Sequence, residues 1–429
     1  MKKKYRIILY TSIFLLCVVA SIILVVKKSN SVYEEESKPK VVKHKSMLSM
    51  NLEQTAGAGD YKTVTQSKWP TEGYKFNAEL SRCENGSTLS WDDTKKAVIV
   101  SGNLSDKCYV YFDIYQPTLA EYIKSQYTGT QGENNIYYHD SDLANGAGDN
   151  SYRYAGANPN NFVCFGTTES PCPTDNLYRI IGVFGENYHG VTGKQLVKLI
   201  KYDYMTTDEL GTDGDYSQTY KEWGMDSTYK GTYGDGERIG VYYWNYKATG
   251  SATNTWSTSL LNKTNLNTNF INNIGTTWAN KIATVTWKVG GNTWANIGTK
   301  TSSVAYTNEI TNPVTTNTTD NATTYSAKIG LMYVSDYGFA ASPDAWTLTM
   351  SSYNNTTATN NNWMYMGLYE WTISRSADYS NRAFLVYNDG GVDYYRVLSN
   401  NGVRASFNLE SSVSYVSGSG SMSDPIVIN

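Results

Sequence analysis

The chain has 429 residues, of which 40% are hydrophobic and 17% charged, with a formal net charge of -3 and 37 tyrosines. This length exceeds one average domain and predicts two or three folded units. Because there is no basic stripe to neutralise phosphates, nucleic acid is excluded as an expected partner. Asn, Thr, Ser, Gly and Tyr supply most of the polarity, so we expect contacts through hydroxyls, amides and aromatic rings.

The first segment of the chain is apolar. Residues 7–26 are mostly Ile, Leu, Val and Phe, enough in helical form to cross a hydrocarbon core of about 30 Å. Four basic residues precede this run and two lysines follow it. The positive-inside rule therefore predicts a cytoplasmic tail at residues 1–6, a single-pass anchor in the cell membrane at 7–26 and an extracellular remainder. A cleavable signal peptide is the alternative.

Four cysteines follow the apolar run in two local pairs, Cys83 with Cys108 and Cys164 with Cys172. An even number of cysteines in an extracellular chain is typical of disulfides. Metal binding is the alternative, but thiolate sites favour CxxC-like spacing with histidine nearby, and the histidines are distant in sequence. We therefore predict two disulfides.

A charged stalk and a small β module are expected next. Residues 27–60 begin with a charged stretch poor in aromatic side chains, which is typical of a solvated stalk. In residues 61–116 the runs KAVIVSG and KCYVYFD alternate polar and apolar positions, with turn signals between them. The pattern predicts an antiparallel β module closed by the Cys83–Cys108 disulfide, because so short a unit has a small core.

The pattern of residues 117–429 predicts a helix and linker followed by one large unit. Residues 117–160 open with a short amphipathic helix and continue as a loop rich in Gly, Asn and Asp. Residues 161–429 contain the hairpin NLYRIIGVF and QLVKLIKYD, the helical stretch WSTSLLNKTNLNTNFI, the strand KIGLMYV with a short helix after it, and several closing strands. Short helices among antiparallel strands predict an α+β fold.

The order of these elements resembles a domain-of-unknown-function family of membrane-anchored surface proteins from Gram-positive (Bacillota-type) bacteria. The resemblance covers residues 161–429. The family's helical signature is matched here by Trp256, Ser257, Ser259, Leu266 and Asn267. Its closing signature is matched by Trp371, Ser374, Arg375, Ala383, Gly390, Gly402, Val403 and Arg404. Family members usually have proline where this chain has Ala405, so a rigid turn is not expected there.

More remotely, the same signature is similar to the formylglycine-generating-enzyme and C-type-lectin superfold. That similarity implies a C-type-lectin-like domain at residues 161–429, whose last strands and loops present a binding surface. Enzymes of the superfold use cysteines in their C-terminal part, whereas no cysteine follows Cys172 in this chain. Oxidation chemistry based on a thiol or on copper is therefore not expected.

The closing strands carry the candidate binding residues. These aromatic and basic side chains are Tyr379, Arg382, Tyr387, Tyr394, Tyr395 and Arg396. Because side chains alternate between the faces of a strand, part of this set should be exposed as a platform for sugar rings or a protein partner. The alternative is that the rings pack in the core or decorate a surface without a partner.

Four further residues of this region are assigned structural roles. Trp363 and Trp371 are expected in the core, because large rings bracketed by strand residues are usually buried. Arg375 and Arg404 have the geometry to clamp a carboxylate, but on this signature they are expected to tie loops together through carbonyl groups or Asp side chains.

One acidic loop is a weak candidate for calcium. Asp208, Asp213 and Asp215 supply the hard oxygen ligands that this ion prefers. The loop lacks the EF-hand spacing and its final glutamate, so a solvated turn explains it as well.

No catalytic constellation is readable, and no catalytic residue or cofactor is predicted. The sequence therefore favours an extracellular binding or adhesion-type protein that recognises a glycan or a surface protein. Two alternatives stay open. One is an extracellular hydrolase or cell-wall-modifying enzyme with an unrecognised carboxylate site, and the other is a structural component of the envelope.

Overall fold

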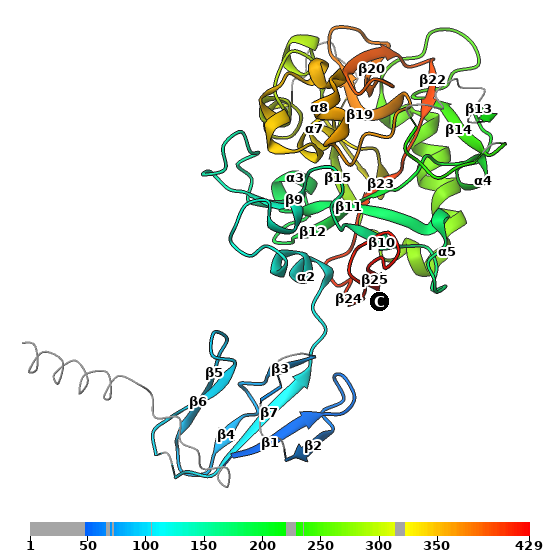
Figure 1. Cartoon of the computed structure of the whole chain (residues 1–429). Helices are drawn as coiled ribbons and strands as arrows, with labels where there is room; N and C mark the ends of the chain where they lie inside the picture. The colour runs from blue at the N-terminus through cyan, green and yellow to red at the C-terminus, as the bar shows by residue number, and fades with distance from the viewer. Residues whose placement is uncertain are drawn as a thin grey trace, which may run out of the picture. The chain divides into compact units, whose positions relative to one another are not determined.

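The computed structural model describes residues 48–65, 69–70, 73–103, 105–219, 229–234, 236–313 and 322–429, with the side chains of 215–219 left out. The chain forms two compact units, the first ending at Tyr115 and the second starting at Gln116 (Figure 1). Of the described residues, 32% lie in strands and 22% in helices. The predicted α+β class is therefore wrong, because the protein is mostly β and its helices are short.

The predicted N-terminal transmembrane helix is not supported. In the described ranges no helix combines the length and the apolar character needed to cross a bilayer. The tail at 1–6, the segment at 7–26 and the start of the predicted stalk lie outside the described residues.

The first unit is built on a five-stranded sheet with the order β2-β1-β7-β3, in which β4 also pairs with β7. These strands are β1 (Leu48–Glu53), β2 (Tyr61–Val64), β3 (Tyr74–Phe76), β4 (Arg82–Cys83) and β7 (Cys108–Ile114). A separate hairpin joins β5 (Thr88–Asp92) and β6 (Ala97–Ser101). Because β1 runs parallel to β7, the module is not purely antiparallel, and residues 48–53 belong to its sheet rather than to a stalk.

The core of the first unit follows from the alternation along β7. Val110 and Phe112 face inward with Cys108, where they meet Met50 and Leu52 of β1. The ring of Phe112 is surrounded by the rings of three other residues, Trp69, Phe76 and Trp91. The predicted Cys83–Cys108 disulfide is confirmed and joins β4 to β7.

One seven-stranded sheet of the second unit has the order β18-β23-β12-β11-β9-β8, with β10 beside β11. Its strands are β8 (Ile136–His139), β9 (Ser151–Tyr154), β10 (Phe162–Cys164), β11 (Leu177–Phe184), β12 (Leu196–Lys201), β18 (Ile329–Gly330) and β23 (Ser406–Asn408). Strands β11 and β12 are buried along their whole length, as in a sheet covered on both faces. The helix predicted at the start of 117–160 is confirmed at Leu119–Ser125, but the linker predicted after it is wrong, since β8 and β9 belong to this sheet.

The second seven-stranded sheet has the order β13-β14-β22-β19-β20-β21, with β16 beside β19. Its strands are β13 (Asp215–Thr219), β14 (Arg238–Tyr243), β16 (Gly291–Asn292), β19 (Glu370–Ser376), β20 (Arg382–Val386), β21 (Val392–Arg396) and β22 (Asn400–Gly402). Two pairs complete the strands, β15 (Val285–Lys288) with β17 (Thr324–Ala327) and β24 (Tyr415–Ser417) with β25 (Val427–Ile428). The C-terminal pair, red in Figure 1, lies beside β10 and the start of the unit.

Short helices fill the space around these sheets. The α-helices are α2 (Leu119–Ser125), α3 (Glu186–His189), α4 (Thr207–Leu210), α5 (Ile271–Ala279), α6 (Ser302–Tyr306), α7 (Val334–Ala340) and α8 (Thr356–Asn360). Tighter or wider turns are η1 (Glu133–Asn135), η2 (Thr174–Asn176), η4 (Trp256–Thr258), η5 (Leu261–Phe270), η6 (Trp294–Asn296), η7 (Thr307–Thr311), η8 (Pro343–Thr347) and η9 (Met350–Asn354).

The core of the second unit is aromatic. Trp363 and Trp371 are buried in it, as their strand-like surroundings predict. The second predicted disulfide, Cys164–Cys172, is also confirmed and links the end of β10 to the loop before η2.

Candidate functional site

The predicted binding residues lie at one edge of the second seven-stranded sheet, on β20 and β21, in the loop before β20 and in the turn between the two strands. The two strands pair antiparallel, with Phe384 opposite Tyr394 and Arg382 opposite Arg396. Because β21 is the last strand in the order of its sheet, its side chains project at an edge of the unit.

Three of the predicted residues form a compact group, the Tyr/Arg cluster of Tyr379, Arg382 and Tyr394. The Arg382 guanidinium lies 4.1 Å from the centroid of the Tyr379 ring and 5.0 Å from that of Tyr394. The two ring centroids are 5.5 Å apart, and Tyr379 is 44% exposed. The guanidinium therefore lies beside both of two adjacent rings, which is a favourable cation–π arrangement.

Neighbouring residues hold this cluster in place. The Trp294 ring packs edge-on against Tyr394, with centroids 5.6 Å apart, and its backbone N–H donates to the Asp378 carboxylate at 2.9 Å. The buried Asn254 amide donates to the carbonyl oxygens of Tyr379 and Arg382 at 2.9 and 2.7 Å. Sequence reasoning missed Asn254 and Trp294, because both approach the closing strands from distant parts of the chain.

The other three predicted residues lie outside this stack. Tyr395 is 51% exposed and Arg396 is also exposed, at the end of β21. Tyr387 is half-buried and packs edge-on against Tyr369, with centroids 5.0 Å apart. Burial, together with the nearby Asp393 carboxylate, raises the pKa of Tyr387 to about 12. The structure therefore brings together half of the predicted platform.

The described side chains of the acidic loop show no metal geometry. Asp208 and Asp213 are exposed, and the side chain of Asp215 lies outside the described residues. Wherever the structure describes side chains, no three His, Cys, Asp or Glu residues are grouped as a metal centre requires. Asp208 lies in the first turn of α4, where negative charge is favourable for the helix.

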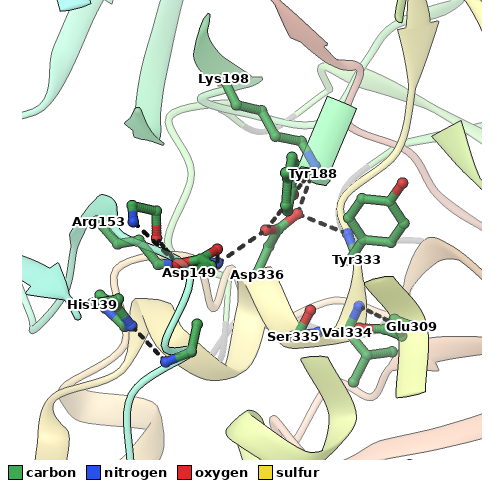
Figure 2. Close-up of polar contacts among 12 residues, drawn as sticks. His139, Asp149, Arg153, Tyr188, Lys198, Glu309, Tyr333, Val334, Ser335 and Asp336 are labelled. Atoms are coloured by element: carbon green, nitrogen blue, oxygen red, sulfur yellow. Dashed lines mark hydrogen bonds and ion pairs between the residues drawn. The ribbon is translucent and has the colours of Figure 1, made fainter. Parts of the chain in front are cut away.

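A buried polar network, which the sequence analysis did not predict, lies between the first seven-stranded sheet of the second unit and α7 (Figure 2). At its centre the Asp336 carboxylate accepts hydrogen bonds from the Lys198 amine at 2.7 Å, the Tyr188 hydroxyl at 2.7 Å and the Tyr333 backbone N–H at 3.0 Å. The Lys198 amine also donates to the Tyr188 hydroxyl at 2.6 Å. Burial lowers the pKa of Lys198, and Asp336 opposes this effect.

Arg153 extends the network toward β9. Its Nη2 donates to the Asp149 carboxylate at 2.8 Å, and its Nη1 lies 3.8 Å from Asp336. Burial works against the charge on Asp149, but the Arg153 guanidinium and the Ser151 hydroxyl outweigh it, so the pKa of Asp149 is lowered. Every charge in this network has an opposite charge beside it.

A second acid, Glu309, lies near the same helix. Its carboxylate accepts hydrogen bonds from the backbone N–H groups of Val334 and Ser335 at 3.0 and 2.8 Å, and from the Ser374 hydroxyl. Burial raises the pKa of Glu309. Because Glu309 and Asp336 are both buried and bonded to protein donors, these contacts hold α7 in place rather than present carboxylates to a substrate.

A signal for this network does exist in the sequence. Lys198 interrupts the apolar strand LVKLIK, and Asp336 interrupts VSDYGFA, two positions where a charge requires a buried partner. What the sequence could not show is that these two residues pair with each other, because 138 positions separate them.

The chain was compared with protein-family models, with curated proteins and with solved structures, and none matches. The resemblance inferred from the sequence motifs therefore stays an expectation.

Proposed function

We propose that this is an extracytoplasmic binding protein that recognises a carbohydrate through the Tyr/Arg cluster. The observation that carries the proposal is the exposed ring of Tyr379, held 4.1 Å from the Arg382 guanidinium. A ring of fixed orientation can stack on the apolar face of a sugar, and an adjacent guanidinium can donate hydrogen bonds to its hydroxyls.

Preorganisation supports this assignment. The loop carrying Tyr379 is tied to Asn254 by side-chain hydrogen bonds, and Trp294 braces Tyr394. Because these contacts hold the cluster without a ligand, binding would cost little additional conformational entropy. Tyrosine is well suited to such surfaces, since it offers a large contact area with few rotatable bonds.

The disulfides support the extracytoplasmic location. Cys83–Cys108 and Cys164–Cys172 lie in different units, and such bonds persist in oxidising compartments. A protein partner would use the same exposed rings, and the test below separates the two ligand classes.

The test is a glycan array probed with the full-length protein, followed by titration of each glycan that binds. We expect a restricted set of glycans to bind, and Tyr379→Ala and Arg382→Met each to weaken binding by about tenfold or more, the loss of one good contact. Tyr246→Ala serves as the matched control, since Tyr246 is 37% exposed outside the cluster and should leave binding unchanged. Absence of glycan binding, or equal binding by all variants, would refute the proposal.

A further inference from the structure

The second unit contains a small cavity of about 10 Å³, and no residue of the Tyr/Arg cluster lines it. It is bounded by η4, by the β15–β17 pair with the residues that flank it, and by β19. The polar and aromatic side chains that line it are Thr255, Trp256, Ser257, Thr324, Tyr325 and Arg375. Thr324 is exposed, so the cavity lies near the surface.

Two of the side chains that line this cavity carry unpaired donors. Arg375 is 1% exposed, and its Nε donates to the Val289 carbonyl at 2.9 Å, but neither Nη1 nor Nη2 has a hydrogen-bond partner among the described residues. Trp256 is also 1% exposed, and its indole Nε1 likewise has none in that part of the chain. Guanidinium and indole N–H groups can only donate, so both require an acceptor.

Other buried arginines of this unit have more hydrogen-bond partners, although Nη1 of Arg153 and of Arg404 has none among the described residues. Arg404 donates to the Glu370 carboxylate at 2.8 Å, and Arg153 pairs with Asp149 at 2.8 Å. Arg179 has no such carboxylate contact, but its guanidinium donates to the Asn161 side chain and the Pro159 carbonyl and stacks on two aromatic rings. Each of these arginines uses at least one terminal nitrogen, whereas Arg375 uses neither.

The backbone accommodates the unpaired guanidinium closely. A Cβ at position 291 would lie 2.7 Å from Nη1 of Arg375, so Gly291 is what lets β16 approach it. Burial without a neighbouring carboxylate lowers the pKa of Arg375 to about 10, which still leaves it charged at neutral pH. A buried charge with unpaired donors is costly, and a bound ion is one of the ways in which proteins satisfy it.

We propose that this cavity binds a small monovalent anion, with chloride as the first candidate, through the Arg375 guanidinium and the Trp256 indole N–H. The charge balance favours a single negative charge, because Arg375 is the one basic side chain among the described residues that line the cavity. The hydroxyls of Thr255, Ser257 and Tyr325 can donate further hydrogen bonds. Water would accept from two of the donors but would leave the positive charge uncompensated.

The direct test is crystallographic. Crystals of the full-length protein soaked in bromide should show an anomalous peak within hydrogen-bonding distance of Arg375 Nη and Trp256 Nε1. A peak at this position supports an anion site. Absence of a peak under conditions that label other sites, with ordered water in its place, overturns the proposal.

The second test is thermal unfolding of the same protein at constant ionic strength, with gluconate replaced stepwise by chloride. A saturable rise in Tm on the order of 3 °C is expected, because the anion binds the folded state. Arg375→Met should abolish this rise, and Trp256→Phe should shift its midpoint to several-fold higher chloride. Lys247→Met is the control: it removes an exposed charge elsewhere in the unit and should leave the rise unchanged.

Three outcomes of the unfolding test would contradict the proposal. The same Tm in chloride and gluconate means that the cavity holds water only. Stabilisation by sulfate or phosphate but not by chloride or bromide means that the monovalent class is wrong. A chloride effect retained in both Trp256→Phe and Arg375→Met places the anion elsewhere. If Arg375→Met fails to fold, the chloride dependence of Tm in Trp256→Phe and the anomalous map from bromide-soaked crystals still test the proposal.

Discussion

Lys198 and Arg375 are both buried cations on strands of the second unit, yet their surroundings differ. The Lys198 amine lies 2.7 Å from the Asp336 carboxylate, inside a network where donors and acceptors largely balance (Figure 2). Arg375 has one carbonyl acceptor, and neither of its terminal nitrogens has a hydrogen-bond partner among the described residues. The comparison teaches that a charge buried with its partner holds elements together, whereas a charge buried without one is suited to a ligand.

The largest loss of stability is expected when the central acid of the network is removed. Asp336→Ala leaves Lys198 and Arg153 buried without their shared carboxylate, and we expect the free energy of unfolding to fall by about 3–5 kcal/mol. Urea denaturation measures this loss. Asp344→Ala, at an exposed position on η8, is the control and should change stability by less than about 0.5 kcal/mol.

The double variant Lys198→Met with Asp336→Leu sharpens the same point. It removes both charges and should recover much of the lost stability, because a buried ion pair is often replaceable by apolar residues of similar volume. A double variant as unstable as Asp336→Ala would show that packing, rather than the unpaired charge, dominates.

The next largest effect separates the two arginines that the sequence analysis treated alike. Arg404→Met strips the buried Glu370 carboxylate of its partner and should cost about 3 kcal/mol. Arg375→Met removes an unpaired charge and one hydrogen bond to a carbonyl, so in chloride-free buffer it should cost less than about 1 kcal/mol. Equal losses in urea denaturation would mean that Arg375 has a partner in solution.

The pH dependence of the free energy of unfolding tests the burial of His139 beside the network. This histidine is buried, and burial together with the nearby Arg153 lowers its pKa well below the ordinary value. As the pH falls below about 6.5, His139 binds a proton in the unfolded chain but stays neutral in the folded chain. This histidine should therefore lower the free energy of unfolding by about 1.4 kcal/mol per pH unit. His139→Asn should flatten the profile between pH 6.5 and 5, and an unchanged slope would assign the effect to other groups.

The smallest expected effect on stability is at the Tyr/Arg cluster. Tyr379→Ala alters a residue that is 44% exposed, and the free energy of unfolding should change by about 0.5 kcal/mol or less. Its glycan affinity should nonetheless fall as stated above. A large loss of stability would show that the stack serves the fold rather than recognition.

Local pattern was a good guide where the partners are close in the chain. The two disulfides join cysteines separated by 25 and 8 positions, and the strand at Cys108–Ile114 shows the alternation that its sequence predicts. The stack of Arg382 on Tyr379 and Tyr394 follows from neighbouring strands, which is why half of the platform was predictable.

Other features needed contacts that no local pattern contains. Parallel pairing of β1 with β7 draws residues 48–53 into the first unit, and β8 and β9 enter the sheet from a stretch that its Gly, Asn and Asp content marks as loop. Composition predicts where a chain can turn, but pairing depends on which strands meet after the turn.

The sequence by itself determined which cysteines pair, which residues alternate along the clearest strands and that basic and aromatic side chains gather near the C-terminus. Only the tertiary structure decided that Arg404, between β22 and β23, meets a carboxylate while Arg375, on β19, does not. The physical reason is that the state of a buried charge depends on groups brought close in space. Those groups come from positions far apart in the chain.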